Sequence, residues 1–256
     1  MSKARIGAAL ALCAGIAAGL LPTSAGAIVN GSFDGDGHPY VGAAVSGDVF
    51  CSGSLVTPTV FVTAGHCTDG FARSGEATFV TFDPQARSTS EYITGTPYTH
   101  PDFFNVPPQG VGLPQSLGSD VGVVVLDQAV ELPRYAALPR LGALDDFVSA
   151  PFSLVGYGAD GWHVGGGRPF PTYTYDRMIA SSRLINLDPE WARNSTSPGR
   201  GNGGIGFHDS GSPALPMGTD IVMAISSHGT HQRGYGNAYW YRLDTADARS
   251  FLEDFV

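Results

Sequence analysis

Three short segments of the chain carry side chains that could together perform nucleophilic catalysis. They are Thr63–Cys67 with His66, Ser119–Leu126 with Asp120, and Asp209–Pro213 with Ser210. A serine hydroxyl is a poor nucleophile at neutral pH unless an imidazole accepts its proton and a carboxylate fixes the tautomer of that imidazole. Each residue alone would usually be structural, but the three together predict acyl-transfer chemistry.

The N-terminus has the organisation of a secretory signal peptide. Lys3 and Arg5 precede an uncharged run over 6–21, and Ala25-Gly26-Ala27 offers small residues at the positions that a signal peptidase reads. The alternative is a membrane anchor, but the run of 16 residues is shorter than the roughly 20 that span a bilayer. We therefore expect residues 1–27 to be removed and the protein to be secreted.

The remaining chain, 28–256, is acidic. Loss of Lys3 and Arg5 leaves 12 of the 14 basic residues against 23 acidic ones, and no lysine remains. Binding to nucleic-acid phosphates needs a basic face, so a nucleic-acid partner is not expected. Nor do we expect membrane association after signal cleavage, and we expect a monomer.

The hydrophobic pattern is that of an all-β protein with a C-terminal helix. Short runs rich in Val, Thr, Phe and Tyr alternate with Gly, Pro, Asp and Ser, which predicts strands; they are 41–45, 54–56, 60–64, 77–82, 121–126, 152–157, 221–226 and 238–242. Long loops are expected at 97–119, 158–170 and 195–206. Asp244 or Thr245 could cap the helix.

Several motifs in this order resemble those of the chymotrypsin-like serine proteases, of a secreted bacterial type. The resemblance covers nearly the whole of 28–256. The motifs are Ile28-Val29-Asn30-Gly31, Thr63-Ala64-Gly65-His66-Cys67, His100-Pro101 followed by Ser119-Asp120-Val121, Gly156-Tyr157-Gly158, Asp209-Ser210-Gly211 and Ser226-Ser227-His228-Gly229.

The resemblance implies a fold and a mechanism. The fold would be two antiparallel six-stranded β-barrels, here roughly 28–135 and 136–256, with the site between them. His66 would be the general base, Asp120 its orienting carboxylate and Ser210 the nucleophile. The substrates would be proteins or peptides, cleaved through an acyl-enzyme with no cofactor and no metal.

Two further pairs follow from the same resemblance. The new amino group of Ile28 would insert into the protein and pair with Asp209, and the predicted signal cleavage would itself create that terminus. Cys51 and Cys67 would form the disulfide that brackets the histidine segment.

The chain departs from the family around the nucleophile. The backbone N–H groups of His208 and Ser210 would form the oxyanion hole, but the family has glycine where His208 stands. The Cβ of a histidine restricts the backbone. Either the loop holds His208 in the productive conformation, or the hole is misformed and the protein is weak or inactive.

The expected substrate pocket also differs from that of trypsin-like members. Its residues would be Gly204, Ser227, His228, Gly229 and Asn237. Gly204 stands where those members have Asp, so a preference for Lys or Arg is not expected, and an uncharged pocket is.

Two groups of residues have ligand types that metals bind, but neither predicts a metal site. The spacing of His208, His228 and His231 matches no zinc motif, and Asp34-Gly35-Asp36-Gly37 lacks the rest of a calcium loop. The sequence therefore favours a secreted serine endopeptidase. The alternatives are an inactive homologue that acts as a secreted binding protein, and a serine esterase.

Overall fold

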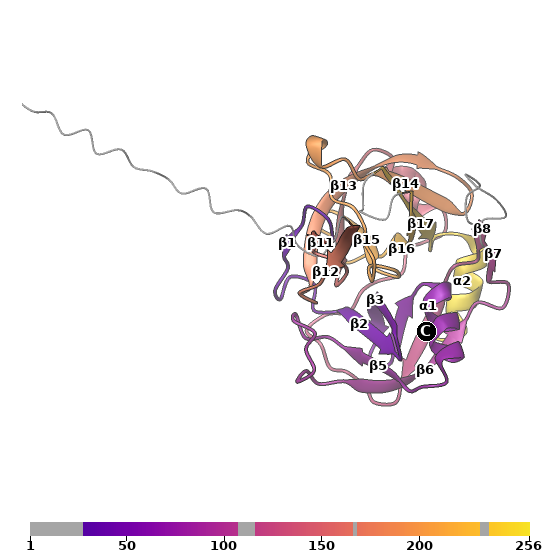
Figure 1. The fold of residues 1–256 in the computed structure, drawn as a ribbon. Coiled ribbons are helices and arrows are strands. Elements are labelled where there is room, and N and C mark those ends of the chain that lie inside the picture. Colours follow the sequence, from indigo (N-terminus) through magenta and orange to yellow (C-terminus); the bar gives the residue numbers. More distant parts are fainter. Residues whose placement is uncertain (1–27, 107–115, 166–167, 231–235) are drawn as a thin grey trace, which may run out of the picture.

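The structure is a computed structural model that describes residues 28–106, 116–165, 168–230 and 236–256. The predicted signal peptide and His231 lie outside these residues. The described chain forms two antiparallel barrels, one above the other in Figure 1. None of the described helices is long and apolar enough to cross a membrane.

The first barrel closes through six strands. In spatial order they are β2 (Val41–Ser46), β3 (Val49–Thr57), β4 (Val60–Thr63), β9 (Gly122–Leu126), β6 (Ile93–Thr99) and β5 (Thr78–Thr81). All four residues of β4 are buried, and so are four of the five residues of β9. These two strands are apolar runs rather than alternating ones because both of their faces are buried. They pair in register from Val60–Val125 to Thr63–Gly122.

The second barrel closes through another six strands. They are β13 (Met178–Leu187), β10 (Pro151–Gly156), β15 (Pro213–Pro216), β16 (Ala224–Gly229), β17 (Asn237–Arg242) and β14 (Trp191–Ser195), which pairs back with β13. Along β13, buried side chains alternate with exposed or half-buried ones over 178–184, the period expected of a strand with one face in a core. Its core includes the fully buried Trp240 and Leu154.

Two hairpins and four short helices complete the fold. The hairpins are β7 (Phe104–Val106) with β8 (Ser116–Gly118), and β11 (Gly161–Gly165) with β12 (Arg168–Thr172). The helices are α1 (Gly65–Ser74), α2 (Ala246–Leu252) and the 3-10 helices η1 (Ala143–Phe147) and η2 (Pro198–Arg200). The Thr245 hydroxyl caps α2 by accepting the Ala248 N–H, as expected.

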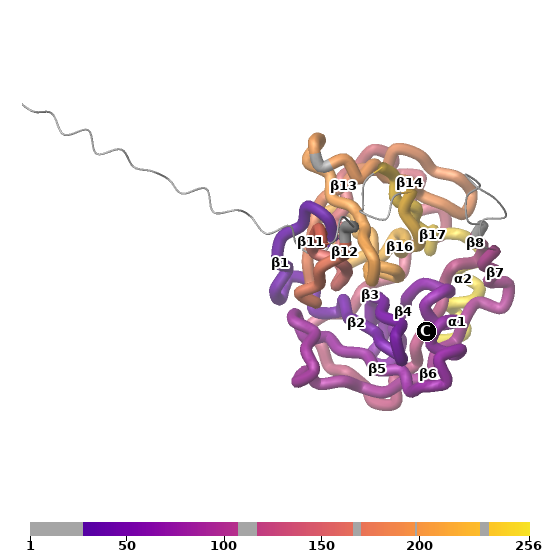
Figure 2. Tube along the Cα trace, viewed as in Figure 1, coloured from indigo at the N-terminus to yellow at the C-terminus, as the bar shows by residue number. Residues whose placement is uncertain are grey.

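The two ends of the described chain cross between the barrels. Near its start, β1 (Ser32–Phe33) pairs with β13 of the second barrel. At the other end, the Phe251 ring of α2 packs, tilted by 53°, at 5.0 Å from the ring of His100, which follows β6 of the first barrel. In Figure 2 the indigo β1 lies beside the second barrel and the yellow α2 beside the first. Each barrel thus receives one end of the chain.

Most of the predicted architecture is confirmed, but three local expectations were wrong. The expectation of a single helix omitted α1, which begins directly before His66. The predicted loop 158–170 contains β11 and the start of β12. The predicted loop 97–119 holds the end of β6 and the β7–β8 hairpin; its residues 107–115 lie outside the described part. Gly and Pro in these segments had indicated loops, but hairpin strands at a surface tolerate them.

Candidate active site

Asp120 holds both the backbone and the ring of His66. The His66 backbone N–H donates to Asp120 Oδ1 at 2.8 Å, and its ring Nδ1 lies 3.0 Å from Oδ2. His66 is the second residue of α1, whose first N–H groups have no partner within the helix, and Ala64 before it offers no side-chain cap. The Asp120 carboxylate therefore both caps the start of α1 and fixes the orientation of the imidazole.

Contact between His66 and Asp120 shifts their pKa values in opposite directions. Asp120 is fully buried, whereas the His66 side chain is 23% exposed. Burial alone would lower the pKa of His66, but the charge of Asp120 and its hydrogen bond outweigh burial and raise that pKa above its usual value. Burial alone would raise the pKa of Asp120, and the neighbouring imidazole reverses this and lowers it. His66 is thus a strengthened base.

Ser227 ties the carboxylate to the second barrel. Its hydroxyl donates to Asp120 Oδ2 at 2.6 Å, because an ionised carboxylate can only accept. The His228 Nδ1 lies 3.1 Å from the same Ser227 oxygen. Since the Ser227 proton is already committed to Asp120, the His228 Nδ1 must be the donor, which fixes the tautomer of neutral His228. Ser227, predicted as a pocket residue, thus also contacts the predicted catalytic carboxylate.

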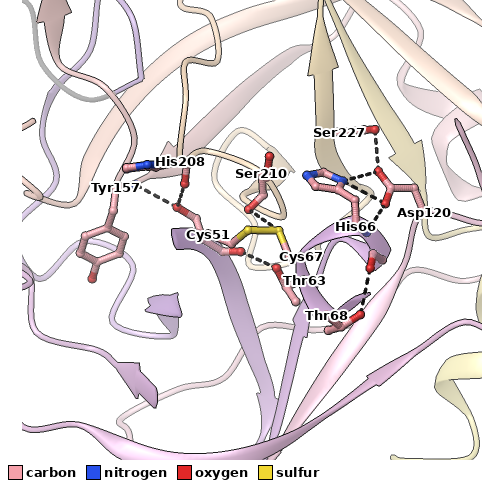
Figure 3. The surroundings of a disulfide bond; sticks show 12 residues. Cys51, Thr63, His66, Cys67, Thr68, Asp120, Tyr157, His208, Ser210 and Ser227 are labelled. Carbon is pink, nitrogen blue, oxygen red and sulfur yellow. Dashed lines mark hydrogen bonds and ion pairs between the residues drawn. A yellow bond between two sulfur atoms is a disulfide. The ribbon is translucent and has the colours of Figure 1, made fainter. Parts of the chain in front are cut away.

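Ser210 lies on the other side of the His66 ring. In Figure 3 that ring stands between Asp120 and Ser210, with its second nitrogen turned toward the serine. Within the described residues no hydrogen bond joins the Ser210 hydroxyl to the ring. Such contacts commonly tighten only when substrate binds. The three residues are therefore brought to one place.

The disulfide lies directly beneath Ser210. Cys51 of β3 and Cys67 of α1 are bonded, as predicted, across a separation of 16 residues. The Cys67 Sγ lies 3.8 Å from the Ser210 carbonyl oxygen. That oxygen also accepts the Ser52 N–H at 2.8 Å. The bridge and the neighbouring strand together fix the backbone of the nucleophile against the helix that carries His66 (Figure 3).

Asp209 is buried among backbone donors. Its Oδ1 accepts the Gly158 N–H at 2.9 Å and its Oδ2 accepts the Gly206 N–H at 2.8 Å. Burial raises the pKa of Asp209 to about 7, although the N–H groups of Gly206, Gly158 and Ile28 oppose the rise. The Ile28 N–H therefore lies near enough to influence this carboxylate, and the Ile28 side chain is fully buried. The predicted activation pair is brought together.

The turn before Ser210 presents two free backbone donors. The Asp209 N–H donates to the Gly206 carbonyl at 3.3 Å, which closes a four-residue turn. Within it His208 has φ +74°, whereas Phe207 is not among the residues with positive φ. This combination defines a type II turn, whose third position favours glycine. Among the described residues, neither the His208 N–H nor the Ser210 N–H has a hydrogen-bond acceptor.

This turn is supported by residues that the sequence analysis did not predict. The Ser52 hydroxyl accepts the Tyr157 N–H and donates to the His208 carbonyl, both at 3.0 Å. The His208 ring stacks on Tyr173 and on Phe50. Phe50 and Ser52 are more than 150 positions from His208 in the chain, so no local pattern could have indicated these contacts.

Four of the five predicted pocket residues lie on two neighbouring strands. Ser227, His228 and Gly229 end β16, and Gly229 pairs with Ala238 of β17, next to Asn237. Gly204 lies against the N-terminal segment, where its N–H donates to the Val29 carbonyl at 3.1 Å. Their role as a substrate pocket stays a prediction.

Comparisons with known proteins agree with this geometry. The family model described as Trypsin matches residues 28–244. The solved structure of HL collagenase is 17% identical with a TM-score of 0.66, and the match covers 89% of this chain and 98% of that one. An inactivated protease paralogue of the scabies mite, S-D1, is 15% identical with a TM-score of 0.62, covering 90% and 96%. At these identities the two structures support the fold alone. No curated protein sequence matches the chain.

Proposed function

Because the chain belongs to the trypsin family, we propose that it is a secreted serine endopeptidase that hydrolyses peptide bonds through an acyl-enzyme. One observation carries the proposal: the His66–Asp120–Ser227 hydrogen-bond set lies beside a serine turn whose two N–H groups have no acceptor in the described part of the chain. A base, its orienting carboxylate, a nucleophile and two oxyanion donors are the parts that acyl transfer needs.

In this mechanism Ser210 Oγ attacks the carbonyl carbon of the substrate while His66 Nε2 accepts the hydroxyl proton. The negative charge that develops on the carbonyl oxygen is stabilised by the N–H groups of His208 and Ser210. His66 then gives its proton to the leaving amine as the C–N bond breaks. Water repeats the sequence on the acyl-enzyme, releasing the acid and restoring Ser210.

We further propose that cleavage after Ala27 completes the site. The Ile28 N–H already lowers the pKa of Asp209, so an ammonium group formed at Ile28 would lie near a buried carboxylate. Ile28 also has φ +57°, a conformation that a β-branched residue avoids. A chain that begins at Ile28 has no such dihedral, so cleavage would remove this strain. A buried carboxylate without a partner costs several kcal/mol, and the new charge pair would offset that cost.

A fluorophosphonate probe tests the proposal on protein that starts at Ile28. We expect stoichiometric labelling that Ser210→Ala abolishes. Ser212→Ala is a matched control because the Ser212 hydroxyl is buried nearby without a hydrogen-bond partner. A peptide library would then test the expected preference for an uncharged residue. Labelling without peptide cleavage, but with ester hydrolysis, would indicate an esterase instead.

An inactive binding protein is the second candidate. It is favoured by His208 at a position where the family has glycine. Absence of labelling at pH 8 in protein that is folded and begins at Ile28 would support this alternative and refute the peptidase.

A further inference from the structure

His208 adopts a backbone conformation that its side chain disfavours. Its φ of +74° is the left-handed region, which residues with a Cβ rarely occupy outside special contexts. An exchange between type II and type I turns rotates the central peptide by about 180° and would turn the His208 N–H the opposite way. A histidine at this position therefore needs outside contacts to keep its N–H where the turn now directs it.

Two backbone groups of the turn are fixed by hydrogen bonds. The Phe207 carbonyl accepts the N–H of the buried Ala159 at 2.8 Å. The His208 carbonyl accepts the Ser52 hydroxyl at 3.0 Å. Neither bond involves the imidazole ring, which is the part of His208 that glycine lacks.

The ring is held by three aromatic side chains from both barrels, here called the aromatic clamp. Its members are Phe50 of β3, and Tyr173 and Tyr175, which follow β12. The His208 ring centroid lies 4.4 Å from that of Tyr173 and 4.9 Å from that of Phe50, with interplanar angles of 19° and 29°. Tyr175 is nearly parallel to it at 6.1 Å. These are offset stacking distances.

The surroundings of the ring favour its neutral form. His208 Nδ1 is buried without a hydrogen-bond partner, and burial lowers the pKa of His208 to about 4. Tyr173 stays protonated as well, because burial raises its pKa to about 12. A neutral imidazole between neutral aromatic rings is a stable stack throughout the range in which a serine peptidase works.

We propose that Tyr173 and Phe50 are positioning residues that hold the oxyanion turn in its left-handed form by clamping the His208 ring. This inference rests on the proposed peptidase function. The clamp supplies by side-chain stacking what glycine supplies by its own conformational freedom. Neither Tyr173 nor Phe50 needs to touch the substrate for this role.

The test is a double-mutant cycle between the clamp and the residue it holds. Tyr173→Ala should lower kcat roughly three- to tenfold with KM nearly unchanged, because the donor acts on the transition state. Tyr173→Phe should keep the wild-type kcat. In the His208→Gly background, Tyr173→Ala should change kcat less than about twofold, because glycine adopts the turn unaided. Phe50→Leu should repeat this pattern if Tyr173→Ala fails to fold.

Tyr98→Ala is the control, since it also removes a tyrosine ring from an aromatic contact, that with Phe255 at 5.3 Å, and Tyr98 lies on β6 rather than beside the turn. It should leave kcat unchanged in both backgrounds. An equal loss of kcat on Tyr173→Ala with His208 and with Gly at position 208 would overturn the proposal, because it would mean a general structural effect. So would the absence of any loss.

An NMR titration separates this proposal from the peptidase assignment. In Tyr173→Ala the pKa of His208 should rise from about 4 toward its usual 6.5, whether or not the protein cleaves peptides. An inactive wild type with this shift would refute the proposed function and support the clamp. An active wild type with no shift and no coupling would refute the clamp alone.

Discussion

Ser227 on β16 of the second barrel donates a 2.6 Å hydrogen bond to Asp120, the residue that orients His66 on the first barrel. The two residues are 107 positions apart in the chain. The carboxylate is thus shared between the barrels, and its strength as a partner of His66 depends on a serine from the opposite half of the molecule.

Removal of this hydroxyl should make His66 more basic. The Ser227 hydrogen bond lowers the pKa of Asp120, so in Ser227→Ala the less stabilised anion should pull more strongly on the His66 proton. The pKa of His66 should rise by roughly half a unit. Activity needs neutral His66, so the acid limb of kcat/KM should move to higher pH by the same amount.

Ser226→Ala is the control for this shift. Its hydroxyl is buried on the same strand and has no hydrogen-bond partner. A Ser226→Ala profile that moves as far as that of Ser227→Ala would contradict the explanation.

Protein that retains residues before Ile28 should lose stability as pH rises from about 4 to about 7. In the uncleaved chain the pKa of Asp209 is raised from 3.8 to about 7. The folded state then binds more protons than the unfolded state across this window, so stability falls as pH rises through it and is constant above it. The loss should be about 4 kcal/mol at most.

Chemical unfolding at pH 5 and pH 8 measures this difference. Protein that begins at Ile28 should show a smaller fall, because an ammonium group favours the charged carboxylate. Asp209→Asn in the extended protein should abolish the dependence. Parallel profiles for the two lengths would mean that the Ile28 amino group does not reach Asp209.

Because no lysine follows Lys3, the α-amino group of Ile28 can be labelled selectively. In a chain that begins at Ile28 the α-amino group is the only primary amine. In the Ser210→Ala variant, which has no nucleophile to acylate, an amine-directed reagent should therefore add at most one label, slowly in the folded protein and quickly after denaturation. Fast labelling of folded protein would indicate an exposed terminus.

Gly211→Ala should lower the free energy of unfolding far more than the positive φ of Gly211 alone explains. A Cβ at Gly211, φ +81°, would lie 2.1 Å from Thr63 Oγ1 and 2.4 Å from the Ser52 carbonyl oxygen. Gly218 has nearly the same φ, +80°, but nothing within 4 Å of a Cβ. Gly218→Ala should cost about 1 kcal/mol, and Gly211→Ala several times more, measured by thermal unfolding. Equal losses of stability in the two variants would mean that the backbone around Gly211 shifts to accommodate the added Cβ.

The sequence predicted those parts of the site whose signals are local. His66, Asp120 and Ser210 each lie in a short segment whose residues resemble a family motif, and the disulfide partners flank the first. The helix α1 was missed because Gly65, Gly70 and polar residues weaken its intrinsic tendency. It is held by tertiary contacts instead, namely the Asp120 carboxylate at its start and the disulfide at Cys67.

The aromatic clamp could not have been predicted from the sequence. Phe50 lies 158 positions before His208 and Tyr173 lies 35 before it, so only the closed barrels bring them together. The sequence indicated that His208 would strain the turn, but the source of its support is a purely tertiary property. The same holds for the contact between Ser227 and Asp120.

The crossing of the chain ends has a consequence for how the molecule comes apart. Since β1 pairs with β13 of the second barrel and α2 packs against the first, each half of the polypeptide lacks contacts that the other half supplies. Melting of one barrel would release a terminus from the other, so calorimetry should record one cooperative transition, and halves expressed separately should remain unfolded.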